Sequence, residues 1–248
     1  MKNDLEVVLL IPDTHIPYHD KRAFNLLLKV GGVLKPKHVI VGGDFIDNYT
    51  VSSHSKDPTR ALKLEEEVNE TKKALDQLKA LGAKNNVFIG GNHEDRLERY
   101  LMDKAPELYN FVSTEKILDL KQKGFKYIPY KQTYKLGKLN ITHDAGNAGL
   151  YAHYKALETY QHNIVINHTH RIGYFVEGNS SGERHVAAMF GWLGDVNQVD
   201  YMHKVKAMKT WSLGFGLGYL DKKTGNVYLV PVPIVNYTVM IEGKLIRG

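Results

Sequence analysis

Five short apolar segments of the sequence each end, within one or two residues, in side chains that can bind a metal. In chain order these side chains are Asp13 and His15, Asp44 and Asp47, Asn92 and His93, His143, and His168 with His170. Ligands of α/β proteins collect at the carboxyl ends of the strands, so we expect these residues to form one site. Oxygen and imidazole ligands in this mixture suit Mn, Fe, Ni or Zn better than Ca.

Each of these positions alone has an ordinary structural explanation. A single Asp after a strand usually forms a turn or caps a helix, and glycine pairs such as Gly42-Gly43 usually mark turns. A single His is more often a structural residue than a ligand. The recurrence of the pattern after five successive strands favours a shared metal site over five unrelated turns.

The first half of the chain alternates between strand and helix signals. Apolar runs predict strands at Leu5–Ile11, His38–Val41 and Val87–Ile89. Amphipathic spacing and capping residues predict three helices. The first is capped by Asp20 and ends at Gly31-Gly32, the second runs from Pro58 to Leu81, and the third runs from Asp95 to Asp103.

The second half of the chain is mostly strand. It holds a hairpin at Thr133–Thr142 and then short strands at Ile164–Asn167, Gly173–Val176, His185–Phe190, Gly214–Leu220, Val227–Val232 and Val235–Ile241. This order predicts an α/β fold, with two mixed β-sheets packed face to face as a sandwich flanked by helices. No repeat or linker divides the chain, so we expect residues 1–248 to form a single domain.

Composition limits the classes of protein to which this chain can belong. It has no Cys, which excludes a disulfide framework, a thiolate metal site and a cysteine nucleophile. The longest apolar run near the start, Val7–Ile11, is far too short to cross a membrane, so we expect a cytoplasmic protein without a membrane partner. The formal net charge is +6, and the excess lies entirely in residues 125–248, which favours a polyanionic partner.

The candidate ligands fall into five motifs. These read Asp13-Thr-His15, Gly43-Asp44-Phe-Ile-Asp47, Gly91-Asn92-His93-Glu94, the isolated His143, and Asn167-His168-Thr-His170. In these motifs the sequence resembles the calcineurin-like metallophosphoesterase superfamily, and the resemblance covers residues 13–170. It implies the metallophosphoesterase fold and a pair of divalent metal ions.

The resemblance also implies a role for each motif residue. One metal would be held by Asp13, His15, Asp44 and His170, and the other by Asp44, Asn92, His143 and His168. A shared Asp44 would offset the repulsion between the two ions, and a bridging hydroxide between them would be the nucleophile. His93 would protonate the leaving alkoxide or stabilise the charge of the transition state. Asp47 would orient His93 or, as an alternative, cap a helix.

Asn167, Asn48 and Gly90 depart from the family pattern. Asn167 replaces the Gly that usually precedes the last His-x-His, and Asn is the least costly substitute if that position needs a positive φ. Protein phosphatases of the superfamily carry Arg where this chain has Asn48 and Gly90. The loss of both cations argues against a phosphoprotein phosphatase and leaves room for a phosphodiester. Asn48 and Arg96 are candidate substrate contacts, although Arg96 could instead pair with an acidic residue of its own helix.

The stretch Lys121–Lys138 interleaves lysines with aromatic residues. Cations for phosphates and rings for stacking are what a groove for single-stranded nucleic acid uses, which makes Lys126, Lys131 and Lys135 candidate substrate contacts. The alternative is a solvated hairpin with lysines outside and rings in the core. A second cluster of basic and aromatic residues, Tyr201–Trp211, has the same two explanations.

We therefore expect a dinuclear-metal phosphodiesterase, a nuclease acting on DNA or RNA, with Mn²⁺ as the favoured metal and Ni²⁺, Fe or Zn²⁺ as alternatives. A second hypothesis is a phosphatase or phosphodiesterase of small nucleotides, whose pocket the loop Tyr49–Asp57 or Trp192 would close. A third is a non-catalytic scaffold, which the intact His93 disfavours. The sequence leaves the oligomeric state open.

Overall fold

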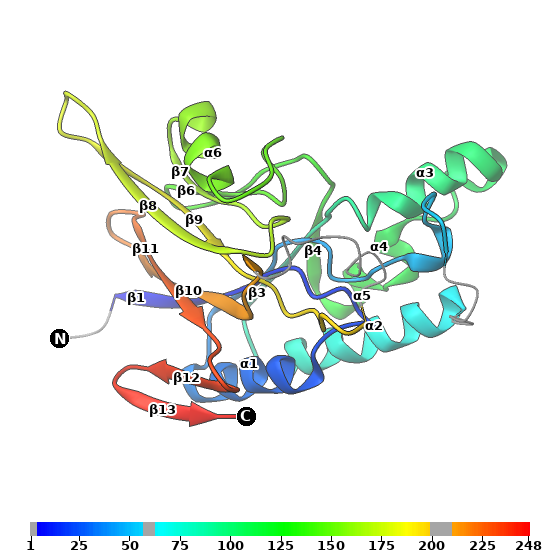
Figure 1. Ribbon diagram of the computed structural model, residues 1–248, viewed down its shortest axis with the longest axis horizontal. Helices are drawn as coiled ribbons and strands as arrows, with labels where there is room; N and C mark the ends of the chain where they lie inside the picture. Colours follow the sequence, from blue (N-terminus) through cyan, green and yellow to red (C-terminus); the bar gives the residue numbers. More distant parts are fainter. Residues whose placement is uncertain (1–3, 57–62, 199–209) are drawn as a thin grey trace.

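The first of two large β-sheets has six strands in the order β11-β10-β1-β2-β3-β4 (Figure 1). The computed structural model describes residues 4–56, 63–198 and 210–248. The strands of this sheet are β1 (Leu5–Ile11), β2 (His38–Val41), β3 (Asn85–Ile89), β4 (Phe125–Ile128), β10 (Gly214–Asp221) and β11 (Val227–Pro233). Strands β1 to β4 are parallel neighbours, whereas β10 pairs antiparallel with both β1 and β11.

The second sheet has five strands in the order β5-β6-β7-β9-β8. They are β5 (Tyr134–Leu136), β6 (Leu139–Ile141), β7 (Asn163–Val165), β8 (Ile172–Gly178) and β9 (Arg184–Phe190). Strands β6, β7 and β9 are parallel neighbours, and β5 and β8 pair antiparallel at the two edges. A separate hairpin of β12 (Thr238–Ile241) and β13 (Lys244–Arg247) packs near α1 (Lys21–Leu34).

Three buried clusters hold the layers together. Ile89 of the first sheet and Phe190 of the second belong to the apolar cluster between the sheets. On the outer face of the first sheet, Phe24 of α1 and residues of α2 (Leu64–Lys79) pack against the strands. Helix α6 (Ala152–Tyr160) covers the outer face of the second sheet. The predicted α/β fold of two mixed sheets packed as a sandwich and flanked by helices is confirmed.

Most of the predicted strands are confirmed to within two residues, and the exception lies near the C-terminus. The expected strand Val235–Ile241 starts only at Thr238, and a second strand, β13, follows it. The helix expected from Pro58 is present in the described residues as α2, and its predicted first residues, 58–62, lie outside them. The sequence also predicted α3 (Asp95–Lys104) but missed β4, α6 and the short helices α4 (Thr114–Ile117) and α5 (Leu120–Lys123).

Helix α1 does not end at Gly31-Gly32, as the glycine pair predicted, but continues to Leu34. Gly31 lies on the buried face of the helix, where a Cβ would be 2.7 Å from Leu81 Cδ1. The glycine therefore permits a close contact between α1 and Leu81, in the turn after α2, and does not stop the helix. Among the described residues, no helix is long and apolar enough to span a membrane.

We expect alanine substitutions at these neighbouring glycines to have opposite effects. Gly32→Ala places a methyl group in open space, and the better helix former should raise the free energy of unfolding by about 0.5–1 kcal/mol. Gly31→Ala gains the same helix propensity but presses on Leu81, and overpacking typically costs about 1–3 kcal/mol. Urea unfolding of both variants measures the difference. Equal stabilisation by both would show that the contact with Leu81 does not constrain residue 31.

Candidate metal centre

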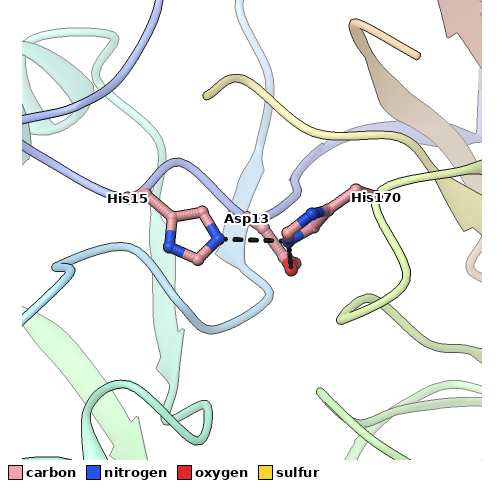
Figure 2. A group of neighbouring side chains, drawn as sticks. All are labelled: Asp13, His15 and His170. Atoms are coloured by element: carbon pink, nitrogen blue, oxygen red, sulfur yellow. Dashed lines mark hydrogen bonds and ion pairs between the residues drawn. The ribbon is translucent and has the colours of Figure 1, made fainter. Parts of the chain in front are cut away.

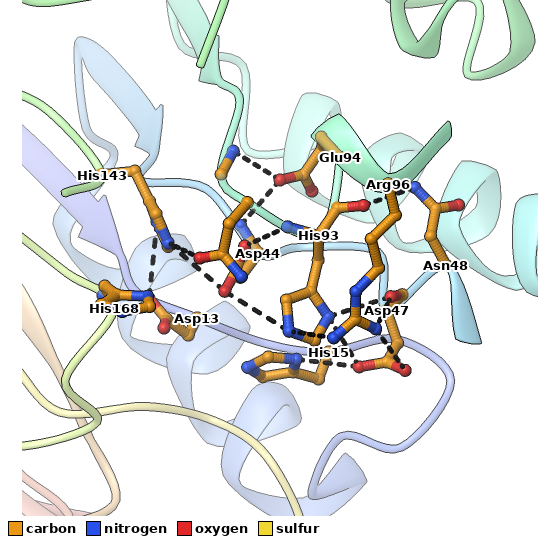
Figure 3. Close-up of polar contacts among 12 residues, drawn as sticks. Asp13, His15, Asp44, Asp47, Asn48, His93, Glu94, Arg96, His143 and His168 are labelled. Carbon is orange, nitrogen blue, oxygen red and sulfur yellow. Dashed lines mark hydrogen bonds and ion pairs between the residues drawn. The ribbon is translucent and has the colours of Figure 1, made fainter. Parts of the chain in front are cut away.

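Residues that follow β1, β2, β3, β6 and β7 lie side by side, and Figure 3 shows Asp13, Asp44, His93, His143 and His168 pointing toward one another. Parallel neighbours carry their carboxyl ends at the same edge, which applies to β1–β3 in one sheet and to β6 and β7 in the other. Among the described residues, six of the seven predicted ligands, together with His93, form groups whose donor atoms lie within 4.8 Å of one another. The ligands in these groups are Asp13, His15, Asp44, His143, His168 and His170.

The first group joins Asp13, His15 and His170, all of them buried (Figure 2). His170 Nε2 lies 3.0 Å from Asp13 Oδ2 and 3.1 Å from His15 Nε2. The other oxygen of Asp13 accepts a hydrogen bond from the backbone N–H of His168. One carboxylate and two imidazole nitrogens that converge in a buried space fit a divalent cation of the first transition row.

The second group joins Asp44, His143 and His168. His143 Nδ1 donates to the backbone carbonyl of Gly42 at 2.9 Å. Its Nε2 therefore faces Asp44 Oδ2 at 3.3 Å and Asn92 Oδ1 at 3.1 Å. An imidazole that a backbone carbonyl orients in this way is typical of metal-binding histidines, so this group also fits a metal.

Asp44 joins a further group with His15 and His93, so its carboxylate lies between the first two groups. Burial opposes its charge, but the imidazoles of His143 and His93 hold the pKa of Asp44 well below its usual range. Burial would likewise lower the pKa of His143, yet nearby carboxylates raise it to about 10. A divalent cation can take the place of the proton on His143. Burial lowers the pKa of His170 to about 4, which leaves this imidazole neutral, the form that binds a metal.

A family model described as calcineurin-like phosphoesterase matches residues 7–213, a span that includes all five motifs. The chain belongs to this family. The resemblance seen in the sequence is thereby confirmed, and it assigns the chain to a family of hydrolases of phosphoric esters. Calcineurin-like phosphoesterases typically bind two divalent metals, in agreement with the candidate groups described above.

Relatives of the chain include two mycobacteriophage proteins, both called Gene 54 protein. The protein of phage L5 is 25% identical over 96% of this chain and 97% of its own length, and that of phage D29 is 25% identical over 91% and 93%. Solved structures similar to this chain include a Vps29 mutant of Entamoeba histolytica, which is 13% identical and has a TM-score of 0.47. The match covers 96% of this chain and 95% of that one. The nuclease MPE of Pseudomonas putida has 15% identity, a TM-score of 0.42 and coverage of 90% and 87%.

Glu94 is a residue of the phosphoesterase motifs to which the sequence assigned no function. Its buried carboxylate accepts hydrogen bonds from the backbone N–H groups of Asp44 (2.8 Å), Phe45 (2.9 Å), Ile46 (3.1 Å) and Gly91 (2.6 Å). Four N–H donors from two loops thus bind a single side chain. The glycine is required there, because a Cβ on Gly91 would lie 2.2 Å from Asp44 Oδ1. The only sequence signal for this contact is the position of Glu94 at the end of Gly-Asn-His-Glu.

Asp47 contacts both histidines that face it. His15 Nδ1 donates to Asp47 Oδ1 at 3.0 Å, and His93 Nδ1 lies 2.9 Å from the same oxygen. Asp47 therefore orients the two rings. It caps neither the short 3-10 helix Tyr49–Val51 nor α3. Arg96 donates to the backbone carbonyl of Asp47 at 2.8 Å and lies 2.9 Å from His93 Nε2, so it faces the site and not the acidic residues of its helix.

The left-handed backbone expected for Asn167 occurs instead at the histidines that follow it. His168 has a φ of 66° and His170 a φ of 57°, whereas the Asn167 amide donates to the carbonyl of Gly42 at 3.1 Å. The predicted substrate contact Asn48 is fully buried, and its amide donates to the carbonyl of His93 at 2.9 Å. This side chain therefore joins the loops that follow β2 and β3.

The predicted lysine contacts lie on two different sheets. Lys126 is on β4, Lys135 is on β5, and Lys131 is in the loop between these strands. Lys126 Nζ lies 5.7 Å from the centre of the Tyr134 ring. Residues 201–209 of the second basic cluster lie outside the described residues.

We expect Glu94→Gln to destabilise the protein by about 2–6 kcal/mol. The amide has a single acceptor oxygen, so two buried N–H groups lose their partner, at about 1–3 kcal/mol each. Glu98→Gln is the matched control, because Glu98 lies one turn later and accepts one long hydrogen bond, from Thr114 at 3.4 Å. Chemical denaturation compares the two variants. A similar small loss in both would contradict the anchoring role of Glu94.

Proposed function

We propose that this calcineurin-like phosphoesterase is a dinuclear-metal phosphodiesterase that cleaves nucleic acid. The observation that carries the proposal is the place of Asp44 between two groups of ligands. In this assignment Asp13, His15, Asp44 and His170 hold one ion, and Asp44, Asn92, His143 and His168 hold the other. Mn²⁺ is the favoured ion, because the ligand set mixes carboxylate, amide and imidazole groups.

When bound, the two ions supply Lewis-acid stabilisation of the phosphate and activate water for attack. The chain's own residues position the proton donor. Both the backbone carbonyl and the carboxylate of Asp47 lie 2.9 Å from His93 Nδ1 and fix the ring. Nε2 lies 3.8 Å from Asp44 Oδ2 and accepts a hydrogen bond from the Arg96 guanidinium at 2.9 Å. In our proposal the Arg96 guanidinium turns from His93 Nε2 to the substrate phosphate, and Nε2 then carries the proton that goes to the leaving oxygen.

The environment of the two positions that lack Arg supports a diester over a monoester. The Asn48 amide donates a hydrogen bond to the His93 carbonyl. At Gly90, a Cβ would lie 2.9 Å from the Tyr127 hydroxyl, which leaves no room for a longer side chain. Arg96 is then a cation in direct contact with the proposed proton donor, His93. A phosphodiester carries one negative charge and needs fewer such partners than a phosphate dianion.

Paired lysines and tyrosines support nucleic acid as the substrate. Lys131 Nζ lies 5.4 Å from the centre of the Tyr130 ring, and that ring lies 6.2 Å from the ring of His143. Cations and rings thus lie along the edges of β4 and β5 and reach the second ligand group. This is the combination that single-stranded nucleic acid requires. Trp192, which could have closed a small-nucleotide pocket, is instead buried against His170.

We expect Asp44→Asn to bind fewer than two metal equivalents and to lose most activity. Asn tolerates the φ of 48° found here and can still accept from the backbone N–H of His93, so the loop should keep its shape while the shared charge is lost. Asp221→Asn is the control, because that carboxylate accepts from Lys223 and Thr224 and lies opposite Leu5, at the end of β1 away from the ligand groups. Elemental analysis after gel filtration counts the metals. Two equivalents at wild-type affinity in Asp44→Asn would disprove the shared ligand.

We expect replacement of Lys126, Lys131 and Lys135 by Glu to abolish binding of a long single strand but to spare hydrolysis of bis-p-nitrophenyl phosphate. The small diester does not reach the lysines, whereas each lost phosphate contact weakens binding of the strand and reduces its salt dependence. A triple Glu variant at exposed Lys79, Lys155 and Lys244 has the same change in charge and is the control. Normal strand cleavage by the first triple variant would favour a small-nucleotide substrate instead.

A further inference from the structure

The chain has two tryptophans, and both contact the same proposed metal ligand. Trp192 stacks on the ring of His170 with 4.9 Å between centroids and 18° between planes. Trp211 meets that ring edge to face, at 4.2 Å and 88°, and lies 4.9 Å from Trp192. One indole therefore covers a face of the imidazole, and a second lies perpendicular to it.

His170 lacks the Nδ1 hydrogen bond that orients His15 and His143. Nδ1 of His143 donates to Gly42, and Nδ1 of His15 donates to Asp47. Nδ1 of His170 is buried and has no hydrogen-bond partner among the described residues. Metal-binding histidines are ordinarily fixed by a hydrogen bond at the second nitrogen, so another contact must fix this ring.

We propose that Trp192 and Trp211 are positioning residues, which hold the His170 imidazole in its metal-binding orientation by ring packing in place of a hydrogen bond. The inference rests on the metal centre proposed above. Offset stacking and edge-to-face contacts are the favoured geometries of aromatic pairs, and together they restrict both tilt and rotation of the imidazole.

Backbone hydrogen bonds tie the tryptophan segments to the ligand loops. Leu193 N–H donates to the carbonyl of Asp13 at 2.7 Å, and Ser212 N–H donates to the carbonyl of His170 at 3.0 Å. Trp192 N–H donates to the carbonyl of Ser212 at 3.1 Å. Gly194 makes room for the indole, because a Cβ there would lie 2.1 Å from the Trp192 ring. The indoles are therefore placed by the same contacts that place the ligands.

Tryptophan fluorescence tests the proposal without any measurement of activity. Both fluorophores contact His170, so binding of paramagnetic Mn²⁺ at that ligand should quench the emission of the intact protein and saturate with the metal. We expect His170→Ala to lose the quenching, whereas His168→Ala, in the other ligand group, should keep it. Trp192→Phe and Trp211→Phe leave one fluorophore each and resolve the two contributions.

Affinity measurements on Trp211 variants test the positioning role itself. Trp211 is half-buried, so its truncation spares the core. We expect Trp211→Leu to bind Mn²⁺ about 10–100-fold more weakly, the usual cost of losing a residue that orients a ligand, and Trp211→Phe to restore the affinity. Phe175→Leu is the matched control, because Phe175 is a half-buried ring in edge-to-face contact with Tyr154, outside the ligand groups. Isothermal titration calorimetry gives the affinities.

The outcomes separate this inference from the proposed function. Wild-type protein that binds two equivalents of Mn²⁺ without quenching, or Trp211→Leu with wild-type affinity, overturns the positioning role and leaves the dinuclear centre standing. Wild-type protein that binds no metal overturns the proposed function and with it this inference. Quenching that His170→Ala abolishes, together with weak binding by Trp211→Leu that Phe restores, supports the positioning role.

Discussion

Two carboxylates cross-link the loops on which the rest of the site depends. The Glu94 side chain binds the backbone N–H of Asp44, and the Asp44 side chain binds the backbone N–H of His93. Each loop thus accepts hydrogen bonds from buried N–H groups of the other. Without these acceptors, the buried N–H groups would be unpaired and would destabilise the fold. Asn48 adds a third link through the carbonyl of His93. The loops after β2 and β3 are therefore one rigid unit, and the proposed bridging ligand and proton donor are placed by it.

The sequence was informative about the fold wherever a strand was a short buried run. Such runs located β1 and β2 to the residue, because buried parallel strands are apolar on both faces. It was misleading at Gly31, where the glycine serves a contact with Leu81, about fifty residues away in the chain. It missed α6, whose nine residues carry a weak amphipathic pattern. Signals that depend on distant partners do not appear in local composition.

The candidate site was predictable in its residues but not in its geometry. Ligand types at strand ends place His15, Asp44 and His170 together, whereas nothing in the sequence indicates that all three have a positive φ. Side chains at such residues are costly and occur where the surrounding contacts over-determine the backbone, often at functional sites. The stretch Lys121–Lys138 shows the same limit. The sequence favoured neither a groove nor a hairpin, and the structure divides this stretch between the edges of two sheets.

The charges of the site explain why metal binding would stabilise the fold. Buried carboxylates at Asp13 and Asp44 are costly unless a positive charge faces them, and these carboxylates raise the pKa of His143 to about 10, which favours the charged imidazole. One proton offsets only part of the charge of two buried carboxylates. Divalent ions in the proposed positions would displace that proton and neutralise the carboxylates more fully. Binding energy from the ions then becomes folding energy, because the unfolded chain does not bring these ligands together. In the proposed centre, the cross-linked loops and the indoles at His170 would hold this costly cluster of charges together for metal binding.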